Sequence, residues 1–500
     1  MDYSKLQNGS DIRGVALEGI AGQHITLTEQ ACRDIGRGFA VWLTKRFPMV
    51  ENLRVAIGRD SRLSGPQLAQ WICASMVEQG ISVIDIGMAS TPAMFMTTVT
   101  EGYNYDASIM ITASHLPFNR NGFKFFTASG GLESSDIKEI LAFAGSDVAT
   151  ERNNGNLQTG TFMDVYAKIL ADKIRAATGE QTPLAGFRIV VDAGNGAGGF
   201  YADKVLKPLG ANTEGSRYLD PDGRFPNHIP NPENEEAMES IIEAVRETNA
   251  DFGIIFDTDV DRAGAVLSDG SELNRNRIIA MLSAILLREH PGTTIVTDSI
   301  TSEGLAKFIA ERGGIHHRFK RGYRNVINES IKLNNNGQDS QLAIETSGHG
   351  ALKENYFLDD GAYLVTKLLI ELARGKKLGY RLETLIETLE EPVENMEFRM
   401  NIQLDDFKDY GQNVIAELTQ YAAAQPGWEL APNNYEGVRV NLNKEHGDGW
   451  FLLRLSLHDP LLPLNIESNS AGGAAQIARE VAEFLTKFDK LDTSSMSAFL

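Results

Sequence analysis

Residues 53–86 read LRVAIGRDSRLSGPQLAQWICASMVEQGISVIDI. The apolar, β-branched run at residues 53–57 predicts a buried strand, and a helix is expected from about Pro66 to Glu78. Pro66 falls in the first turn of that helix, where a missing N–H is harmless. A second apolar run at residues 81–86 predicts the next strand. A strand, a helix and a strand in this order are typical of a parallel βαβ unit, so the stretch indicates an α/β fold.

The same rhythm restarts twice, at the apolar runs of residues 188–191 and 293–296. From Phe398 the pattern changes to apolar/polar alternation at residues 439–442 and 450–457, which predicts a β-hairpin. A chain of 500 residues is expected to form about three to four domains. We therefore expect three similar α/β domains with mixed sheets and a smaller α+β C-terminal domain, with bounds at 1–180, 181–290, 291–397 and 398–500.

Composition and charge narrow the class of function. The formal net charge of -20 argues against binding to a nucleic-acid backbone, which needs clustered Lys and Arg. A small anionic substrate stays possible because it needs a few convergent cations only. The two cysteines, Cys32 and Cys73, are too few for a disulfide framework. The apolar run at residues 278–287 is too short to span a bilayer, and with no signal-like N-terminus we expect a cytoplasmic protein without a membrane partner.

A hydroxyl and an ammonium follow the strand expected at residues 109–111. Ser114 lies just beyond this strand, and Pro117 prevents the strand from continuing. Lys124, ten residues on, is able to donate or accept a proton if burial or neighbouring cations lower its pKa. A serine at such a place is also a common turn residue, so the motif alone leaves both interpretations open.

Three carboxylates follow the strand expected at residues 253–256. Asp257, Asp259 and Asp261 occupy alternate positions, where an extended loop directs them the same way, and hard oxygen ligands of this number suit Mg²⁺. A calcium loop of the EF-hand type is excluded because Arg262 stands where it needs glycine and Ser268 where it needs an acid. A solvated acidic loop is the alternative.

Glycines after the strand at residues 188–191 give a competing signal. Residues 194–199 fit the spacing G-x-G-x-x-G of dinucleotide-binding turns, and Glu214 would then be the ribose-binding acid. This pattern keeps a nucleotide-dependent oxidoreductase as an alternative. Any tight strand-to-helix turn tolerates glycines, however, so the pattern alone is weak.

Two further pairs of side chains suit a sugar phosphate. Glu345 and Ser347 end an apolar run two residues apart, as required to bind neighbouring sugar hydroxyls. Arg454 and Ser456 are predicted on one face of one strand, where a guanidinium and a hydroxyl bind a phosphate together. An outward-facing salt bridge is the alternative for the second pair.

Taken together, these motifs resemble the α-D-phosphohexomutase superfamily, most closely its phosphomannomutase/phosphoglucomutase branch. The resemblance covers nearly the whole chain. The matching segments are residues 10–14 (SDIRG), 112–115 (TASH), 194–199, 222–226 (DGRFP), 230–232 (PNP), 257–262 (DTDVDR), 345–349 (ETSGH) and 454–460 (RLSLHDP).

The resemblance implies a central cleft between the four domains and a role for each matching residue. Ser114 would carry the phosphoryl group that interconverts a hexose 1-phosphate and a hexose 6-phosphate, with hexose 1,6-bisphosphate as intermediate and activator. Ser114 and the three aspartates would ligate Mg²⁺. The implied catalytic residues are Ser114, Lys124, Arg13, Arg262 and His115, and the implied substrate-binding residues are Glu345, Ser347, His349, Lys320, Arg321, Arg454, Ser456 and His458. Sugar phosphates would be the partners. Independently of the resemblance, a monomer or a homodimer is expected because two-fold dimers are the commonest oligomers.

The sequence departs from the family pattern at three places. Leu116 stands where asparagine is usual, Thr258 where glycine is common, and residues 457–459 (LHD) replace the usual Gly or Asn, Thr and Glu. The third change alters shape and charge at the phosphate end of the predicted site. A sugar-phosphate-binding relative that is specialised or catalyses no reaction is therefore a further alternative.

Overall fold

A computed structural model describes residues 2–456 and 459–499 of the chain. By their internal contacts the residues divide into two compact units, each described by itself here. Unit 1 comprises Met1–Asn274 and Ser347–Thr384, and unit 2 comprises Arg275–Thr346 and Leu385–Leu500.

The first sheet of unit 1 is mixed, as predicted. Its strands run in the order β1-β2-β6-β5-β3-β4-β8. The central strands β3, β4 and β5 are parallel, and β6 is antiparallel to both β5 and β2. The bounds are β1 (Gln7–Asn8), β2 (Asp11–Val15), β3 (Arg54–Arg59), β4 (Ser82–Met88), β5 (Ala107–Ile111), β6 (Arg120–Thr127), β7 (Gly130–Gly131, paired with β6) and β8 (Asn156–Thr159).

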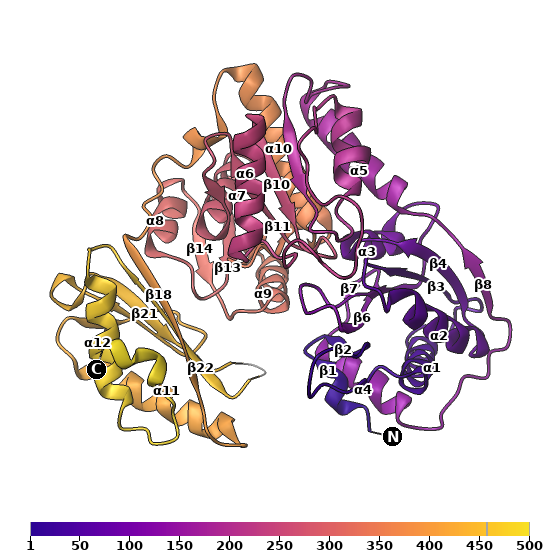
Figure 1. The fold of residues 1–500 in the computed structure, drawn as a ribbon, viewed down its shortest axis with the longest axis horizontal. Helices are drawn as coiled ribbons and strands as arrows, with labels where there is room; N and C mark the ends of the chain where they lie inside the picture. Colours follow the sequence, from indigo (N-terminus) through magenta and orange to yellow (C-terminus); the bar gives the residue numbers. More distant parts are fainter. Residues whose placement is uncertain (1, 457–458, 500) are drawn as a thin grey trace. The chain divides into compact units, whose positions relative to one another are not determined.

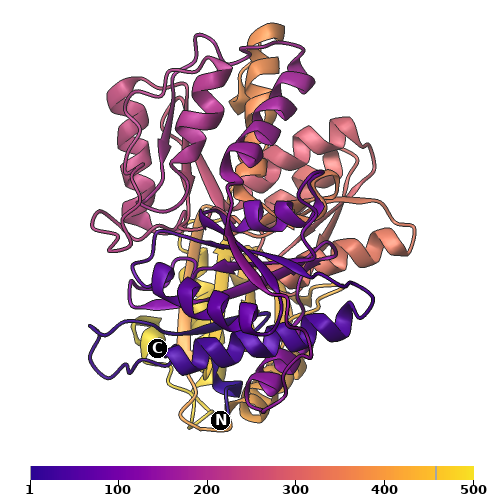
Figure 2. The same ribbon diagram turned by 90° about the vertical axis from the view of Figure 1, so that its right-hand side faces the viewer.

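Helices α1 (Glu29–Arg46), α2 (Gly65–Glu78) and α4 (Ser134–Ala144) pack with this sheet, and α1 contacts both others (Figure 1 and Figure 2). The core between them is apolar and includes Phe39, Ile57 and Phe123, each fully buried. The predicted βαβ unit is thus confirmed as β3, α2 and β4. Helix α3 (Thr91–Val99) begins shortly after β4 ends at Met88. Its first residue, Thr91, belongs to the site described below.

A second, four-stranded sheet in unit 1 carries the acidic motif. Its order is β12-β11-β10-β9, with β9 parallel to β10 and the others antiparallel. The bounds are β9 (Ile189–Asp192), β10 (Phe252–Phe256), β11 (Ala263–Leu267) and β12 (Glu272–Leu273), with helices α5 (Met163–Thr178), α6 (Glu235–Thr248) and α10 (Gly361–Leu378) and the short hairpin of β16 (Gly350–Leu352) and β17 (Leu358–Asp359).

The glycine-rich turn after β9 packs against the acidic loop. A Cβ added to Gly196 would lie 2.6 Å from the Thr258 carbonyl oxygen, and one added to Gly199 would lie 2.2 Å from the Leu219 carbonyl oxygen. The segment that follows is a short π-helix, Tyr201–Leu206, rather than an α-helix whose N-terminus could face a pyrophosphate. Close backbone packing therefore explains the glycines that suggested a dinucleotide site.

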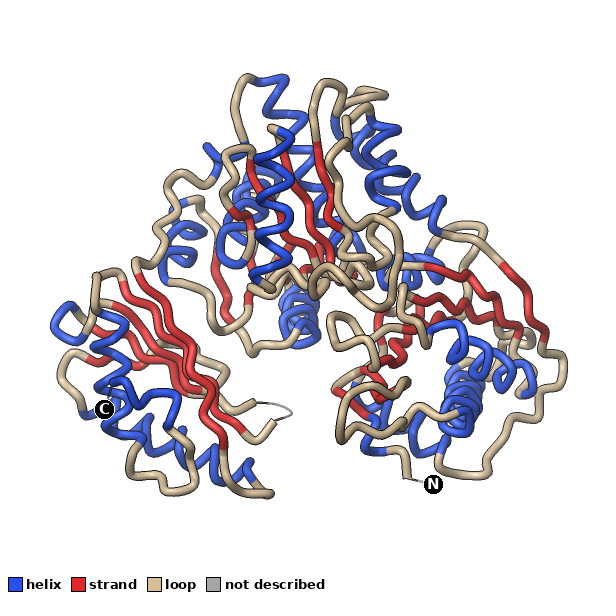
Figure 3. The backbone as a smooth tube through the Cα atoms, in the orientation of Figure 1, coloured by secondary structure: helices blue, strands red, loops and turns tan. Residues whose placement is uncertain are grey.

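Unit 2 combines a parallel sheet with an antiparallel one. Strand β13 (Thr294–Thr297) pairs in parallel with β14 (Ile315–Arg318) and β15 (Ser340–Ile344), beside α7 (Arg275–Glu289), α8 (Glu303–Glu311) and α9 (Tyr323–Asn335). The C-terminal sheet has the order β18-β22-β21-β20-β19 and is antiparallel throughout. Helices α11 and α12 cover one face of it (Figure 3). The bounds are β18 (Glu394–Asn401), α11 (Phe407–Ala424), β19 (Trp428–Leu430), β20 (Val438–Leu442), β21 (Gly449–Leu453), β22 (Leu461–Ser468) and α12 (Gly473–Leu485).

The structure confirms the α/β and α+β classes and the hairpin of β20 and β21. It differs in three details. Strand β8 was not predicted: its four residues lie in a polar stretch and are all exposed at the sheet edge, so no apolar pattern marks it. Strand β21 ends at Leu453 instead of continuing to residue 457. The predicted boundary at 397/398 falls inside β18, and the four-domain division stays a prediction. Within residues 2–456 and 459–499, no helix is both long and apolar enough to cross a membrane.

Candidate active site

The loop after β5 presents the Ser114 hydroxyl to the acidic motif. Ser114 adopts a φ of 50°, a left-handed conformation that is uncommon for serine, and its N–H donates to Thr112 Oγ1 at 2.9 Å. The Ser114 hydroxyl donates to Asp257 Oδ2 at 3.2 Å and accepts from Arg262 Nη2 at 2.8 Å. Two motifs that lie 143 residues apart in the chain thus meet within unit 1.

The three aspartates form one buried cluster. Asp257, Asp259 and Asp261 are each fully buried, and one carboxylate oxygen of each lies within 4.8 Å of the others. Burial, together with the charges of Asp261 and Asp259, raises the pKa of Asp257 well above its usual value. The Oδ1 atoms of Asp259 and Asp261 have no hydrogen-bond partner within the described residues. Crowded carboxylates with unused oxygens suit a divalent cation, so this donor set fits a metal ion and the solvated-loop alternative is wrong.

Thr91, at the first position of α3, holds one of these carboxylates. Its hydroxyl donates to Asp259 Oδ2 at 2.5 Å and its N–H donates to the Asp259 carbonyl at 2.8 Å. Sequence reasoning missed Thr91, because nothing in its local pattern connects it with a loop 168 residues away.

Lys124 lies on β6 beside the same cluster. Its ammonium forms a close ion pair with Asp261 and lies 3.5 Å from Asp259 Oδ2, and the residue is buried. Burial by itself would raise the pKa of Asp261, but Lys124 and His349 lower it below its usual value. Lys124 and the carboxylate of Asp261 therefore form a buried ion pair within the acidic cluster.

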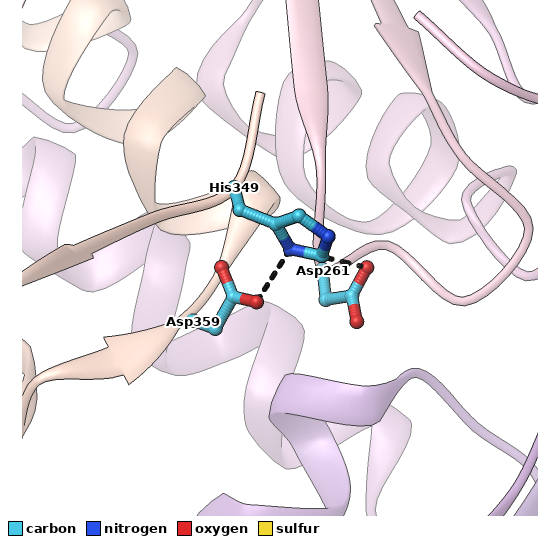
Figure 4. A group of neighbouring side chains, drawn as sticks. All are labelled: Asp261, His349 and Asp359. Carbon is cyan, nitrogen blue, oxygen red and sulfur yellow. Dashed lines mark hydrogen bonds and ion pairs between the residues drawn. The ribbon is translucent and has the colours of Figure 1, made fainter. Parts of the chain in front are cut away.

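His349 and Asp359 extend the cluster (Figure 4). His349 Nδ1 lies 2.6 Å from Asp359 Oδ2 and 3.9 Å from Asp261 Oδ1. Although burial disfavours the charged imidazole, Asp359 and Asp261 raise the pKa of His349 to about 9. In the structure this trio is a network of ion pairs, and its three ligand atoms lie within 4.8 Å of one another. Asp359 was missed by sequence reasoning.

Arg13 contacts the loop that contains Ser114, and His115 belongs to that loop. Arg13, on β2, donates to the Thr112 carbonyl oxygen and, at 2.8 Å, to Asp11 Oδ2. His115 Nδ1 lies 2.5 Å from Arg262 Nη2, and burial, reinforced by the Arg262 charge, lowers the pKa of His115 to about 3. His115 is therefore neutral at pH 7, with Nδ1 accepting from Arg262.

Unit 2 groups a second set of predicted residues around Glu345. The Glu345 carboxylate, 3% exposed, accepts from the Gly322 N–H at 2.6 Å, so it fixes the loop that contains Lys320 and Arg321. The Arg321 N–H donates to Glu436 Oε2 at 3.1 Å, and Lys320 is exposed in the same loop. Glu436 was not predicted. Ser347 is buried and belongs to unit 1 by the division above.

Arg454 and Ser456 lie beyond the end of β21 rather than on one face of a strand, which corrects the prediction. The Arg454 N–H donates to the Pro463 carbonyl oxygen, and the Ser456 N–H donates to the Leu461 carbonyl oxygen. Both residues therefore still hydrogen-bond to β22 although β21 has ended. Arg454 is buried, its Nε has no hydrogen-bond partner within the described residues, and burial lowers its pKa. The outward-facing salt bridge considered above is wrong. His458 lies outside the described residues.

Comparison with known families gives three consecutive matches. Residues 4–148 match phosphoglucomutase/phosphomannomutase alpha/beta/alpha domain I, residues 164–270 match domain II, and residues 274–390 match domain III. These spans include Ser114, the three aspartates and Glu345.

Whole-chain relatives agree with the domain matches. A phosphoglucomutase of Neisseria gonorrhoeae is 32% identical over 92% of this chain and 93% of its own. A phosphomannomutase/phosphoglucomutase of Pseudomonas putida is 31% identical over 92% of each chain. Among solved structures, a phosphoglucomutase/phosphomannomutase family protein of Burkholderia thailandensis superposes with a TM-score of 0.79 at 27% identity, covering 97% of this chain and 98% of its own.

Proposed function

Because the chain belongs to the phosphoglucomutase/phosphomannomutase family, we propose that it interconverts the 1-phosphate and 6-phosphate of mannose, glucose or both. Ser114 would carry the phosphoryl group, and hexose 1,6-bisphosphate would be the intermediate and the activator. The observation that supports this most directly is the convergence of the Ser114 hydroxyl with Asp257 and Arg262.

The metal of this site would be Mg²⁺, held by Ser114 with Asp257, Asp259 and Asp261. Their oxygens are hard ligands, and the unused Oδ1 atoms of Asp259 and Asp261 support the assignment. When bound, the ion would neutralise charge on the transferring phosphoryl group.

The protein groups supply the remaining needs of phosphoryl transfer, which are position and charge. The Arg262 guanidinium bonds to the Ser114 hydroxyl and neutralises charge there, and Arg13 adds a second cation at the loop. His115 orients Arg262 by accepting its N–H. Lys124 would act as general acid and base, taking the proton from the attacking sugar hydroxyl and returning one to the leaving oxygen.

Substrate binding would involve both ends of the sugar phosphate. Glu345, Ser347 and His349 would contact sugar hydroxyls. The cationic side chains Lys320, Arg321 and Arg454, with Ser456 and His458, would bind the phosphate that does not react. We place the protein in the cytoplasm, as a monomer or homodimer that acts on free sugar phosphates.

A coupled assay with glucose 1-phosphate and mannose 1-phosphate tests the proposal, with Mg²⁺ and a trace of hexose 1,6-bisphosphate present. We expect turnover by the wild type that collapses in Ser114→Ala. Binding of hexose phosphates without any turnover would replace the mutase with a sugar-phosphate sensor. A rise in melting temperature with NAD(H) or NADP(H) instead would revive the oxidoreductase alternative.

A further inference from the structure

Arg62, in the turn after β3, is bound to the loop that contains Ser114. Its side chain is fully buried, and its guanidinium donates to four carbonyl oxygens within residues 114–120. Nη1 donates to Pro117 at 2.8 Å and to Arg120 at 3.0 Å, while Nη2 donates to Leu116 at 2.6 Å and to the Ser114 carbonyl itself. Its partner Asp60 lies 3.4 Å from Nε and accepts the Arg62 N–H at 2.9 Å.

These bonds determine how the reactive hydroxyl is held. Ser114 has a positive φ, which a side-chain-bearing residue keeps only where its surroundings impose it. The bond from its N–H to Thr112 Oγ1 fixes the peptide before Ser114, and the bond from Arg62 to its carbonyl fixes the peptide after it. The Ser114 Oγ is thereby aimed at Arg262 and Asp257.

The bonds from Arg62 also reduce the negative charge around the phosphoryl group. Carbonyl oxygens repel an anionic phosphoryl group, but four carbonyl oxygens of this loop point to the buried Arg62 guanidinium instead. A planar guanidinium with five donors makes such a multiple contact, whereas the ammonium of lysine, a compact charge, cannot span it.

Residues 223–225, in another segment of unit 1, pack against Arg62 and its turn. The Phe225 ring centroid lies 5.2 Å from Arg62 Cζ, and a Cβ added to Gly223 would lie 2.3 Å from the Ser61 carbonyl oxygen. The segment of residues 223–225 therefore packs directly on the Arg62 turn, and Phe225 also keeps a positive φ of 49° there.

We propose that Arg62 is a positioning residue for phosphoryl transfer, and this inference rests on the proposed function. In the step concerned, the bond between Ser114 Oγ and phosphorus breaks, a bond from the sugar oxygen to phosphorus forms, and overall one proton passes from the sugar hydroxyl, through Lys124 in its neutral amine form, to Ser114 Oγ. Arg62 holds the donor oxygen in line for this exchange without touching substrate.

The test uses full-length wild type, Arg62→Lys and the control Arg59→Lys. Arg59 precedes the same turn but pairs with Asp85 at 3.0 Å instead of with the phosphoserine loop. Each protein is phosphorylated with glucose 1,6-bisphosphate, checked by intact mass, and mixed with glucose 6-phosphate in a single turnover. For Arg62→Lys we expect transfer and kcat to fall at least about tenfold with KM within about twofold, because misplacement of a reacting atom slows chemistry rather than binding. Arg59→Lys is expected to match wild type.

The outcomes separate the inference from the proposed function. If Arg62→Lys lowers the melting temperature but each folded molecule transfers at the wild-type rate, Arg62 is structural only and the inference is overturned. If Arg62→Lys does not fold, Phe225→Leu replaces it, because this variant loosens the packing of the ring on Arg62. We then expect a smaller fall in kcat with KM again nearly unchanged. An unchanged kcat overturns the inference. If the wild type itself turns over no hexose phosphate, the proposed function fails. In that case the rate at which the Ser114 phosphate is hydrolysed, measured by intact mass, tests whether Arg62 positions the phosphoryl group. Equal hydrolysis rates in wild type and Arg62→Lys would contradict this role.

Discussion

The two units hold their candidate site residues in different ways. In unit 1 the charged side chains face one another: Lys124 pairs with Asp261, and Arg262 contacts both Asp257 and Ser114, while the Oδ1 atoms of Asp259 and Asp261 have no hydrogen-bond partner among the described residues. In unit 2 the buried Arg454 keeps an Nε without a hydrogen-bond partner among the described residues. A preassembled network suits the chemical step, and a buried cation with an unused donor suits capture of an anion. If the proposed function holds, we expect substitutions at Ser114 and the aspartates of unit 1 to act mainly on kcat and substitutions at Arg454 of unit 2 to act mainly on KM.

The most severe test of this division removes the phosphoryl carrier. Ser114→Ala is expected to lower kcat by at least about 10³-fold, because no other group at the site takes the covalent role. Intact mass after incubation with glucose 1,6-bisphosphate should show no added phosphate. The exposed Ser129 is the matched control, and a Ser114→Ala enzyme with normal turnover would remove the phosphoserine from the mechanism.

Removal of one carboxylate should be the next largest effect. Asp259→Asn is expected to lower kcat by about 10²-fold or more and to weaken the metal site, because Asp259 loses the charge that attracts the cation. Thermal denaturation with and without Mg²⁺ checks the second point, since a ligand of the native state raises its melting temperature. The rise should shrink in Asp259→Asn but persist in Asp203→Asn, an exposed surface control. An equal rise in all three proteins would contradict the proposed metal site.

Arg454→Lys sharpens the comparison from the side of unit 2. We expect KM for glucose 1-phosphate to rise about tenfold with a smaller change in kcat, because lysine keeps the charge but loses the forked contact with phosphate. Steady-state kinetics measure both constants. Arg479→Lys, exposed on α12, should leave both unchanged. A fall in kcat at constant KM would reverse the roles assigned to the two units.

The smallest expected effect concerns stability. Burial raises the pKa of Glu467, on β22, to about 7, although Arg439 opposes the shift. An acid with a raised native pKa contributes stability below its unfolded value near 4.5 and loses it as the pH rises through 7. The loss is at most about 3 kcal/mol. Chemical denaturation of Glu467→Gln between pH 4.5 and 8 should show a flatter dependence than wild type, and parallel curves would exclude this titration.

Much of the fold was readable from local pattern. The run at residues 53–86 marks β3, α2 and β4 because buried strands and amphipathic helices repeat at different periods. Strand β8 was not predicted because an exposed, polar edge strand lacks the alternation of buried apolar residues. The end of β21 at Leu453 was missed because apolar residues continue past the last regular pairing.

Part of the candidate site was equally readable. The three aspartates were recognisable because carboxylates at alternate positions after a strand are chemically unusual, whereas Ser114 was distinguished from a turn residue only by the resemblance of the whole set of motifs to a known family. Arg62, Thr91, Asp359 and Glu436 were not recognisable, because each acts through contacts with residues far away in the chain.

The sequence by itself determined the order of strands and helices, the family and the chemical types available at each motif. Only the tertiary structure decided which of them meet and in what charge state. Ser114 and Asp257 are 143 residues apart, and their contact depends on the tertiary fold of unit 1, which brings the loop after β5 to the loop after β10. Likewise His349 becomes a cation and His115 a neutral acceptor because burial and neighbouring charges, absent in an extended chain, set their pKa values.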